Sequence, residues 1–306
     1  MERSLKDYTI ISLKGIAMGA ADVVPGVSGG TIAFVSGIYE ELIQSINKIN
    51  FNALKILKNE GIAAAWKSIN GNFLLALLTG IFISVISLAK IIRQLLETQP
   101  VLLWSFFFGL VLASVIYVAK QITEWRLITF VMLILGAIAA FLITRIQPQQ
   151  LEMSYTFIFF AGALAICAMI LPGISGSFIL LLLGAYKPVL DAIHYKDFKT
   201  LAILAFGAIV GLLTFSRLLK WFFDHYENIT LATLTGFIIG SLNKIWPWKE
   251  VLQSEIIDGK LKVLQEKSVS PMAYDGDNQL LYAVFFAVLG FLIIVLLEKL
   301  AVKKSE

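Results

Sequence analysis

Long apolar stretches alternate with short polar connections along this chain, and three consecutive stretches in each half are long enough to span a membrane. A transmembrane helix takes about 20 predominantly apolar residues. The predicted spans cover residues 71–93, 100–120 and 127–145 in the first half, and 200–222, 229–246 and 280–298 in the second. This pattern predicts an all-α integral membrane protein.

Each half also begins with an apolar stretch that proline and glycine interrupt near its middle. Residues 25–30 (Pro-Gly-Val-Ser-Gly-Gly) interrupt the stretch 8–46, and residues 172–177 (Pro-Gly-Ile-Ser-Gly-Ser) interrupt the stretch 155–193. Proline stops a helix, and glycine permits the tight backbone geometry that follows. Backbone groups freed at membrane depth must lie inside protein or line a polar cavity. We therefore expect two broken, re-entrant helical hairpins.

The two halves align beyond these motifs. Pro25 aligns with Pro172 at a shift of 147 residues, whereas Gly80 aligns with Gly207 at a shift of 127. A longer polar loop over about 47–70 in the first half accounts for the difference. The alignment indicates an internal duplication.

We interpret this duplication as a first repeat over 1–148 and a second over 149–306, which form one integrated transmembrane domain. Each repeat is predicted to be a broken hairpin followed by three transmembrane helices. A hairpin returns to the side it left and three spans end on the other side, so the second repeat is expected to be inverted. Such inverted repeats are typical of secondary transporters, whose substrate sites lie at broken helices.

Composition and charge agree with this interpretation. The chain is 58% hydrophobic and 15% charged, its mean hydropathy is +0.83, and its net charge is +4. Basic residues are more frequent in the loops on the side of both termini, which predicts that both termini are cytoplasmic. No cluster of basic and aromatic residues suggests a nucleic-acid groove. The single cysteine, Cys167, excludes an intrachain disulfide.

The serine of each motif lies near the N-terminus of the outgoing helix. Unpaired N–H groups and the positive end of the helix dipole favour anions there, and two inverted copies would bring two such ends toward the middle of the membrane. The alternative is a closely packed pair of kinked helices with glycines at the contacts. Because the motif occurs twice, we favour a binding site. Its predicted substrate-binding residues are Pro25, Gly26, Ser28, Gly29, Gly30, Pro172, Gly173, Ser175, Gly176 and Ser177.

Charged residues supply further candidates. Asp22 precedes the first break inside an apolar run, where an ionisable group is a functional candidate, either as a titrating proton site or as a helix cap. Two i,i+3 pairs near the ends of matching spans would suit a phosphate at each membrane surface, although ordinary interfacial anchoring is the alternative. These substrate-binding pairs are Lys90 with Arg93 and Arg217 with Lys220. The polar or proton-coupling candidates are Lys14, Asp22, Glu40 and Glu41.

No spacing typical of a metal site, no nucleophile–base pair and no nucleotide-binding motif occurs in the sequence. We therefore predict neither a metal nor an organic cofactor, and no enzymatic activity.

Two stretches carry a resemblance to a known family. Residues 14–31 read Lys-Gly-Ile-Ala-Met-Gly-Ala-Ala-Asp-Val-Val-Pro-Gly-Val-Ser-Gly-Gly-Thr, and residues 37–42 read Gly-Ile-Tyr-Glu-Glu-Leu. They resemble the bacterial undecaprenyl-phosphate translocase family called PopT, formerly an uncharacterised-domain family. Residues 171–177 and 183–186 look like its second repeat, so the resemblance covers nearly the whole chain.

The resemblance implies a transporter in the bacterial cytoplasmic membrane. It would return the phosphate headgroup of a lipid carrier to the cytoplasmic leaflet, for reuse in envelope polymer synthesis. Its partners would be a polyprenyl-phosphate substrate and membrane lipids. Protons are the candidate coupling ion, because moving one negative charge against an inside-negative potential costs about 2.3 kcal/mol per 100 mV.

Two alternatives remain beside this hypothesis. A membrane undecaprenyl-pyrophosphate phosphatase resembles this chain in architecture but carries an arginine directly after the motif serine, where this chain has Gly29 and Gly176. The other alternative is a transporter or channel for small anions, because spacing by itself indicates only an inverted-repeat transporter for an anion.

Overall fold

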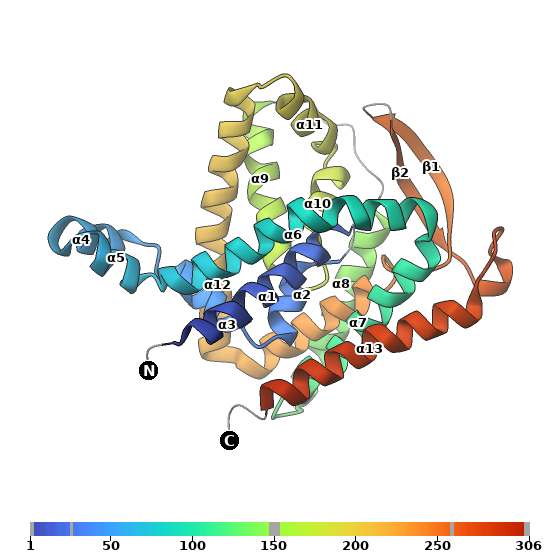
Figure 1. Ribbon diagram of the computed structural model, residues 1–306, viewed down its shortest axis with the longest axis horizontal. Helices are drawn as coiled ribbons and strands as arrows, with labels where there is room; N and C mark the ends of the chain where they lie inside the picture. Colours follow the sequence, from blue (N-terminus) through green and yellow to red (C-terminus); the bar gives the residue numbers. More distant parts are fainter. Residues whose placement is uncertain (1–2, 25–26, 147–153, 258–259, 303–306) are drawn as a thin grey trace.

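The computed structural model describes residues 3–24, 27–146, 154–257 and 260–302, and helices form most of it (Figure 1). Among these residues, four helices are long and apolar enough to cross a membrane: α6 (Gly71–Thr98), α7 (Pro100–Lys120), α8 (Leu127–Arg145) and α12 (Phe198–Ser241). Two further apolar helices are α9 (Tyr155–Ile170) and α13 (Leu280–Val302). The outer faces of these apolar helices carry exposed large apolar side chains, such as Phe82 on α6, Leu142 on α8 and Phe285 on α13. Because such surface is unfavourable in water, the fold is that of a multi-pass membrane protein.

Helix α12 contains the span predicted at 200–222 and most of the span predicted at 229–246. Its 44 residues correspond to about 66 Å, more than twice the ~30 Å hydrocarbon core of a bilayer. The helix is kinked at Tyr226, whose φ and ψ are −140° and 49°. The equivalent residue of the first repeat, Gln99, separates α6 from α7 with φ −139° and ψ 53°. The same backbone conformation therefore joins the first two spans of both repeats.

Each broken stretch folds as three helices. The first comprises α1 (Leu5–Val23), α2 (Gly29–Val35) and α3 (Tyr39–Asn47), and the second comprises α9, α10 (Gly176–Leu182) and α11 (Tyr186–His194). The breaks predicted at residues 25–30 and 172–177 separate the first two helices of each set. A second break follows at Gly37 and at Gly184, both with φ of +70°, which favours glycine. Helices α10 and α11 are bent by 107° relative to each other.

Close helix packing is repeated at equivalent positions of the two halves. A Cβ atom on Gly15 would lie 2.3 Å from the carbonyl oxygen of Leu77, and one on Gly162 would lie 2.3 Å from that of Leu204. These residues are related by the same shifts of 147 and 127 that align the sequences. Helix α1 therefore packs against α6 as α9 packs against the first half of α12, which extends the duplication from sequence to packing.

The third spans pack against the opposite repeat. A Cβ atom on Gly109 of α7 would meet the carbonyl oxygen of Ala287 in α13 at 1.8 Å. Likewise, a Cβ atom on Gly236 of α12 would meet that of Leu133 in α8 at 2.1 Å. Because α13 thus packs against the first repeat and α8 against the second, the two repeats are interlocked.

Two polar connections hold structure of their own. The loop predicted over 47–70 contains two short helices, α4 (Phe51–Glu60) and α5 (Ile62–Ser68), which extend away from the body of the protein (Figure 1). The mixed-charge connection near 247–279 departs from the all-α prediction. It contains the antiparallel strands β1 (Lys249–Ile257) and β2 (Lys260–Ser268), followed by a 3₁₀ turn η1 (Pro271–Ala273). The dipeptide Asp258-Gly259 between two alternating segments is the sequence signal for this hairpin.

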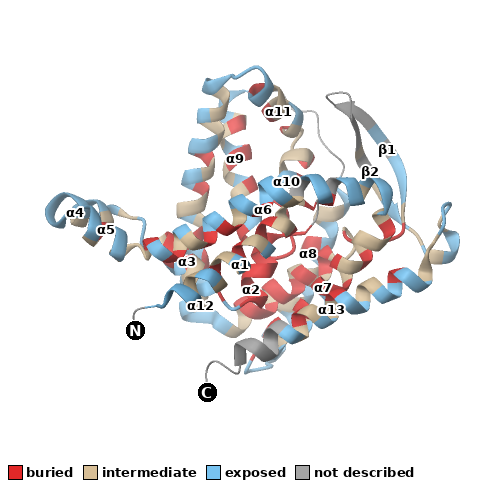
Figure 2. Cartoon of the chain, in the orientation of Figure 1, coloured by how far each residue is buried: buried red, intermediate tan, exposed pale blue. Residues whose placement is uncertain are grey.

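Buried residues gather in the centre of the molecule, where α2 contacts both α1 and α7 (Figure 2). The two helix breaks contribute to this core, since Val24, Val27 and Ile174 beside them are all buried. Helices α3 and α11 lie apart from each other, α3 beside α12 and α11 at the top of Figure 1. The breaks are therefore central, and each leads to a short helix at a different edge of the protein.

Candidate functional site

The two helix breaks contact each other directly. Ser28 at the start of α2 is completely buried, and its hydroxyl donates a hydrogen bond to the carbonyl oxygen of Leu171 at 3.1 Å. The hydroxyl of Thr31 accepts one from the backbone N–H of Gly173 at 2.9 Å. Side chains of the first break thus satisfy backbone groups that the second break leaves free, as membrane depth requires. Two predicted motif residues lie outside the described residues: Pro25 and Gly26.

Tyr39 of α3 extends this contact. Its hydroxyl donates a hydrogen bond to the carbonyl oxygen of Ile170 at 3.1 Å. The centre of its buried ring lies 4.6 Å from the ring centre of Phe34 and 6.1 Å from that of Phe223. A Cβ atom on Gly30 would lie 2.7 Å from the same carbonyl oxygen of Ile170. Glycine at this position therefore permits the close approach of the two breaks.

The first break is capped by its own side chains. The Asp22 carboxylate accepts a hydrogen bond from the N–H of Gly29 at 2.7 Å, and the Ser28 hydroxyl accepts one from the N–H of Gly30 at 3.1 Å. Asp22 thus occupies the position at the start of α2 where an anionic substrate is expected from the motif. Its equivalent in the second repeat is Met169, which offers no carboxylate. The two breaks are therefore chemically different.

The second break is buried except at its last residue. Pro172, Gly173, Ser175 and Gly176 are buried, whereas Ser177 is exposed and shares a hydrogen bond of 2.8 Å between its hydroxyl and that of Ser175. Gly173 has φ of +91°, in the left-handed region that favours glycine. The exposed serine hydroxyl is the polar group that this break presents at the surface of the protein.

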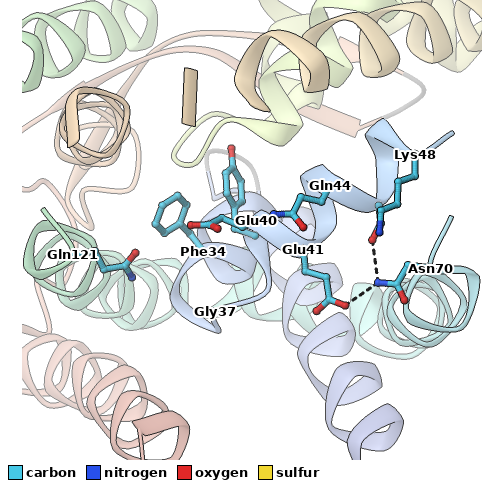
Figure 3. A pocket seen from close by; sticks show the side chains of 10 residues that line it. Phe34, Gly37, Glu40, Glu41, Gln44, Lys48, Asn70 and Gln121 are labelled. Atoms are coloured by element: carbon cyan, nitrogen blue, oxygen red, sulfur yellow. Dashed lines mark hydrogen bonds between the residues drawn. The ribbon is translucent and has the colours of Figure 1, made fainter. Parts of the chain in front are cut away.

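A polar pocket of about 570 Å³ lies at the end of α2 and along α3, and Tyr39, which contacts the second break, is part of its lining (Figure 3). We call it the α3 pocket, because most of its lining comes from α3 and the turn before it. Its side chains carry carboxylates, amides, two hydroxyl groups and an ammonium group. The lining residues are Phe34, Gly37, Tyr39, Glu40, Glu41, Gln44, Ser45, Lys48, Asn70 and Gln121.

One carboxylate of the α3 pocket is neutralised by neighbouring groups. Two guanidinium nitrogens of Arg3 lie 2.5 and 2.7 Å from the carboxylate oxygens of Glu41, and the Asn70 amide donates to Glu41 at 2.8 Å (Figure 3 shows the Asn70 contact). The ammonium group of Lys14 donates to the carbonyl oxygen of Ser36, which caps α2 beside the pocket. Basic groups therefore lie around the pocket although two glutamates line it.

The predicted basic pairs are placed unequally. Lys220 lines a smaller pocket of about 160 Å³ that shares Glu40 and Gln44 with the α3 pocket, and it forms an i,i+4 ion pair with Asp224. Arg217 and Lys90 are exposed on α12 and α6. The side chain of Arg93 lies outside the described part of the structure. Lys220 is thus the member of these pairs that a described pocket contains.

The second repeat has a pocket at the equivalent position. It measures about 330 Å³ and lies at the junction of α9, α11 and the start of α12. Five of its residues are the repeat equivalents of α3 pocket residues Glu41, Gln44, Ser45, Lys48 and Asn70, in the same order: Pro188, Asp191, Ala192, Tyr195 and Asp197. The duplication therefore includes the pockets, although their charged groups differ.

Sequence reasoning did not select several residues that build this region. Thr31 and Tyr39 lie inside the motif segments, so their place beside the motif was the available signal. Asn70 and Gln121 lie at the ends of separate spans and join the α3 pocket only in the folded chain. A polar residue at a span end is otherwise ordinary, and nothing in the sequence distinguishes these two.

Spanning helices, two broken helices that meet in the core and a polar pocket beside them place the chain among multi-pass membrane proteins built like secondary transporters. The model of the undecaprenyl phosphate translocase-like (VCA0040-like) family matches residues 18–262, so the chain belongs to that family. No solved structure matches it.

Two relatives carry the name polyprenyl-phosphate transporter. The protein from Vibrio cholerae serotype O1 is 47% identical over 302 residues, which cover 97% of this chain and 98% of the relative. The protein from Staphylococcus aureus is 34% identical over 253 residues, which cover 77% of this chain and 85% of the relative. The resemblance stated from the motifs is thereby confirmed.

Proposed function

We propose that this protein moves a polyprenyl phosphate across the bacterial cytoplasmic membrane. The phosphate headgroup passes through the protein while the prenyl tail stays in lipid. The names of the relatives support the substrate class. The observation that supports the path is the direct contact between the two helix breaks, beside the α3 pocket. Transporters bind their substrates at such paired breaks.

The α3 pocket is the proposed headgroup site of the first repeat. Lys48, Asn70 and Gln121 offer donors for the phosphate oxygens, and Arg3 offsets the charge of Glu41. Lys220 lies in the adjoining smaller pocket. Arg217, one turn earlier on the exposed face of α12, is the proposed contact for a headgroup that leaves the pocket, since arginine binds phosphate bidentately.

Two carboxylates are the proposed proton sites. A phosphate dianion beside Glu40 favours the protonated carboxyl group, because two negative charges in one pocket repel each other. Protonation of Asp22 would remove the charge that now pairs with the N–H of Gly29, and would leave that N–H available to the headgroup. Each proton carried with the phosphate offsets about 2.3 kcal/mol per 100 mV of membrane potential.

The proposed topology is inverted, with both termini in the cytoplasm. In this arrangement the α3 pocket faces the cytoplasm, because the basic loops of the first repeat lie on its side. The equivalent pocket of the second repeat faces outward. A headgroup would then reach the paired breaks from either side in turn.

Leaflet-specific detection of undecaprenyl phosphate tests this function. Cells that lack the protein should accumulate the lipid in the outer leaflet, and cells that overproduce it should show less there than the wild type. Purified protein in vesicles should also translocate a fluorescent polyprenyl phosphate. Release of inorganic phosphate from undecaprenyl pyrophosphate by the purified protein, without translocation, would instead establish the phosphatase alternative.

A further inference from the structure

The connection between α12 and α13 brings together two lysines and one glutamate in a largely buried position. The ammonium groups of Lys244 and Lys249 lie 3.2 and 3.3 Å from the same carboxylate oxygen of Glu266. The side chains are 19%, 8% and 21% exposed, respectively. The three groups together carry one surplus positive charge when all are ionised. A largely buried surplus charge is unfavourable unless an anion compensates it.

The ionisation of the cluster reflects this imbalance. Burial lowers the pKa of Lys249 to about 8, against the attraction of Glu266. Burial alone would raise the pKa of Glu266, but the two lysines lower it below its usual value. Glu266 therefore stays a carboxylate and remains bound to both lysines, and among the described side chains no second carboxylate pairs with either lysine.

This cluster, which we call the lysine clamp, borders the second helix break. The ammonium group of Lys249 lies 3.9 Å from the ring centre of Trp104 in α7, and that of Lys244 lies 4.8 Å from the ring centre of Phe178 in α10. Phe178 directly follows Ser177, the exposed serine of the second motif. The lysine clamp therefore contacts α10, the short helix that begins at the second break.

The repeat symmetry gives the clamp its position relative to the transport path. Gln121 lines the α3 pocket, and its equivalent in the second repeat is the buried Trp248, which immediately precedes Lys249. The hairpin of β1 and β2 thus begins where the first repeat has the edge of an open pocket. Glu266 on β2 pairs with Lys249 at the start of β1, and it joins the hairpin to the segment after α12 through Lys244.

We propose that Lys244 and Lys249 form a binding site for a phosphate monoester at the second break, and that Glu266 is its exchangeable internal occupant. This inference rests on the proposed function and names the capture site of the second repeat. A phosphate monoester carries close to two negative charges and three acceptor oxygens, so it compensates both lysines where the carboxylate compensates one. When it displaces Glu266, the hairpin loses its ion pair to Lys244 and the pair between its two strands, Lys249 with Glu266.

Binding of farnesyl phosphate to the purified full-length protein in nanodiscs tests the site. A change in tryptophan emission reports binding. The part of this change that is lost in Trp104→Phe comes from the lysine clamp, because Lys249 lies against the Trp104 ring. Lys249→Met and Lys244→Met should each weaken binding about tenfold or more, as expected when a charge-assisted hydrogen bond is lost. Glu266→Gln removes the competing carboxylate charge and should tighten binding about tenfold. Lys267→Met, on the exposed part of β2, is the matched control and should bind as the wild type does.

The opposite directions of these changes in affinity distinguish a ligand-binding site from an ion-pair cluster that only stabilises the fold. If Glu266→Gln weakens binding as much as Lys249→Met, or if both lysine variants keep wild-type affinity, the proposal is overturned. Equal affinity for inorganic phosphate and farnesyl phosphate would assign the site to free phosphate and overturn the lipid assignment. If the wild type translocates polyprenyl phosphate and both lysine variants translocate it equally fast, this site is refuted but the proposed function is not. If the wild type translocates no polyprenyl phosphate, the proposed function itself is refuted.

Discussion

The hydroxyl of Thr31 accepts a hydrogen bond from the backbone N–H of Gly173, 142 residues further along the chain, and joins the first helix break to the second. The duplication does not provide the reciprocal contact, because the equivalent of Thr31 in the second repeat is Phe178. The first break therefore supplies side-chain partners to the second break through Thr31, Ser28 and Tyr39. This asymmetry distinguishes two halves that share their helical packing.

Replacement of Thr31 by valine tests the contact between the breaks. Valine keeps the shape of threonine but leaves the buried N–H of Gly173 without its acceptor, which costs about 1–3 kcal/mol. We expect a lower melting temperature and at least tenfold slower translocation in vesicles. Thr31→Ser retains the hydroxyl and should remain close to the wild type. A Thr31→Val protein with wild-type melting and translocation would contradict the coupling of the two breaks.

Gly176 tests how closely the second break must pack. A Cβ atom there would lie 2.6 Å from the carbonyl oxygen of Ala165, so Gly176→Val should abolish translocation. Ser175→Ala removes only a hydroxyl that pairs with Ser177 and should reduce translocation less than tenfold. Both variants are to be compared in vesicles after size-exclusion chromatography confirms folded protein. Full translocation by folded Gly176→Val would exclude this break from the path.

Substitutions of Asp22 test whether this residue only caps helix α2 or also takes up the coupled proton. In the Asp22→Asn variant, the amide oxygen of the new side chain can still accept the N–H of Gly29, but the side chain cannot take up a proton. We therefore expect Asp22→Asn to fold normally while its translocation no longer responds to an imposed pH gradient. Asp22→Ala leaves the N–H unpaired and should lower stability by about 1–3 kcal/mol. Retention of the full pH-gradient response by Asp22→Asn would make Asp22 a helix cap only.

Single cysteines test the inverted topology. Lys55 lies on α4 and His194 lies at the end of α11. In the proposed topology these two polar positions face opposite sides of the membrane. In intact cells, a membrane-impermeant maleimide should label His194→Cys but should label Lys55→Cys only after permeabilisation. The native Cys167 is to be replaced by serine in both proteins. Labelling of both positions from the same side would remove the inverted-repeat arrangement.

The pH dependence of farnesyl phosphate binding tests the charge of Lys249. Its pKa of about 8 means that it is charged at pH 7 and loses its proton as the pH rises through 8. The second ionisation of a phosphate monoester lies near pH 6, so the ligand remains a dianion above pH 7. Affinity at the lysine clamp should therefore fall several-fold between pH 7 and 9 in the wild type. Lys249→Met should show no such fall, and a parallel fall in that variant would assign the titration to another group.

Local chemistry explains what could be predicted of the site from the sequence. Proline and glycine interrupt a helix wherever they stand, so the breaks at Pro172 and beside Ser28 follow from residue type alone. The roles of these residues depend on partners far along the chain. The Ser28 hydroxyl was expected to face a substrate, yet it contacts the carbonyl oxygen of Leu171. The α3 pocket likewise takes Asn70 and Gln121 from two different spans.

The membrane-spanning helices and the two helix breaks could be predicted from the sequence, because hydropathy and backbone preference act over short stretches of chain. Three features appear only in the folded chain: α13 packs against α7 and α8 against α12, the two breaks contact each other, and Lys249 is buried beside Glu266. Such contacts join residues that sequence spacing does not relate. They depend on which apolar faces pack together and on which buried polar groups then find partners.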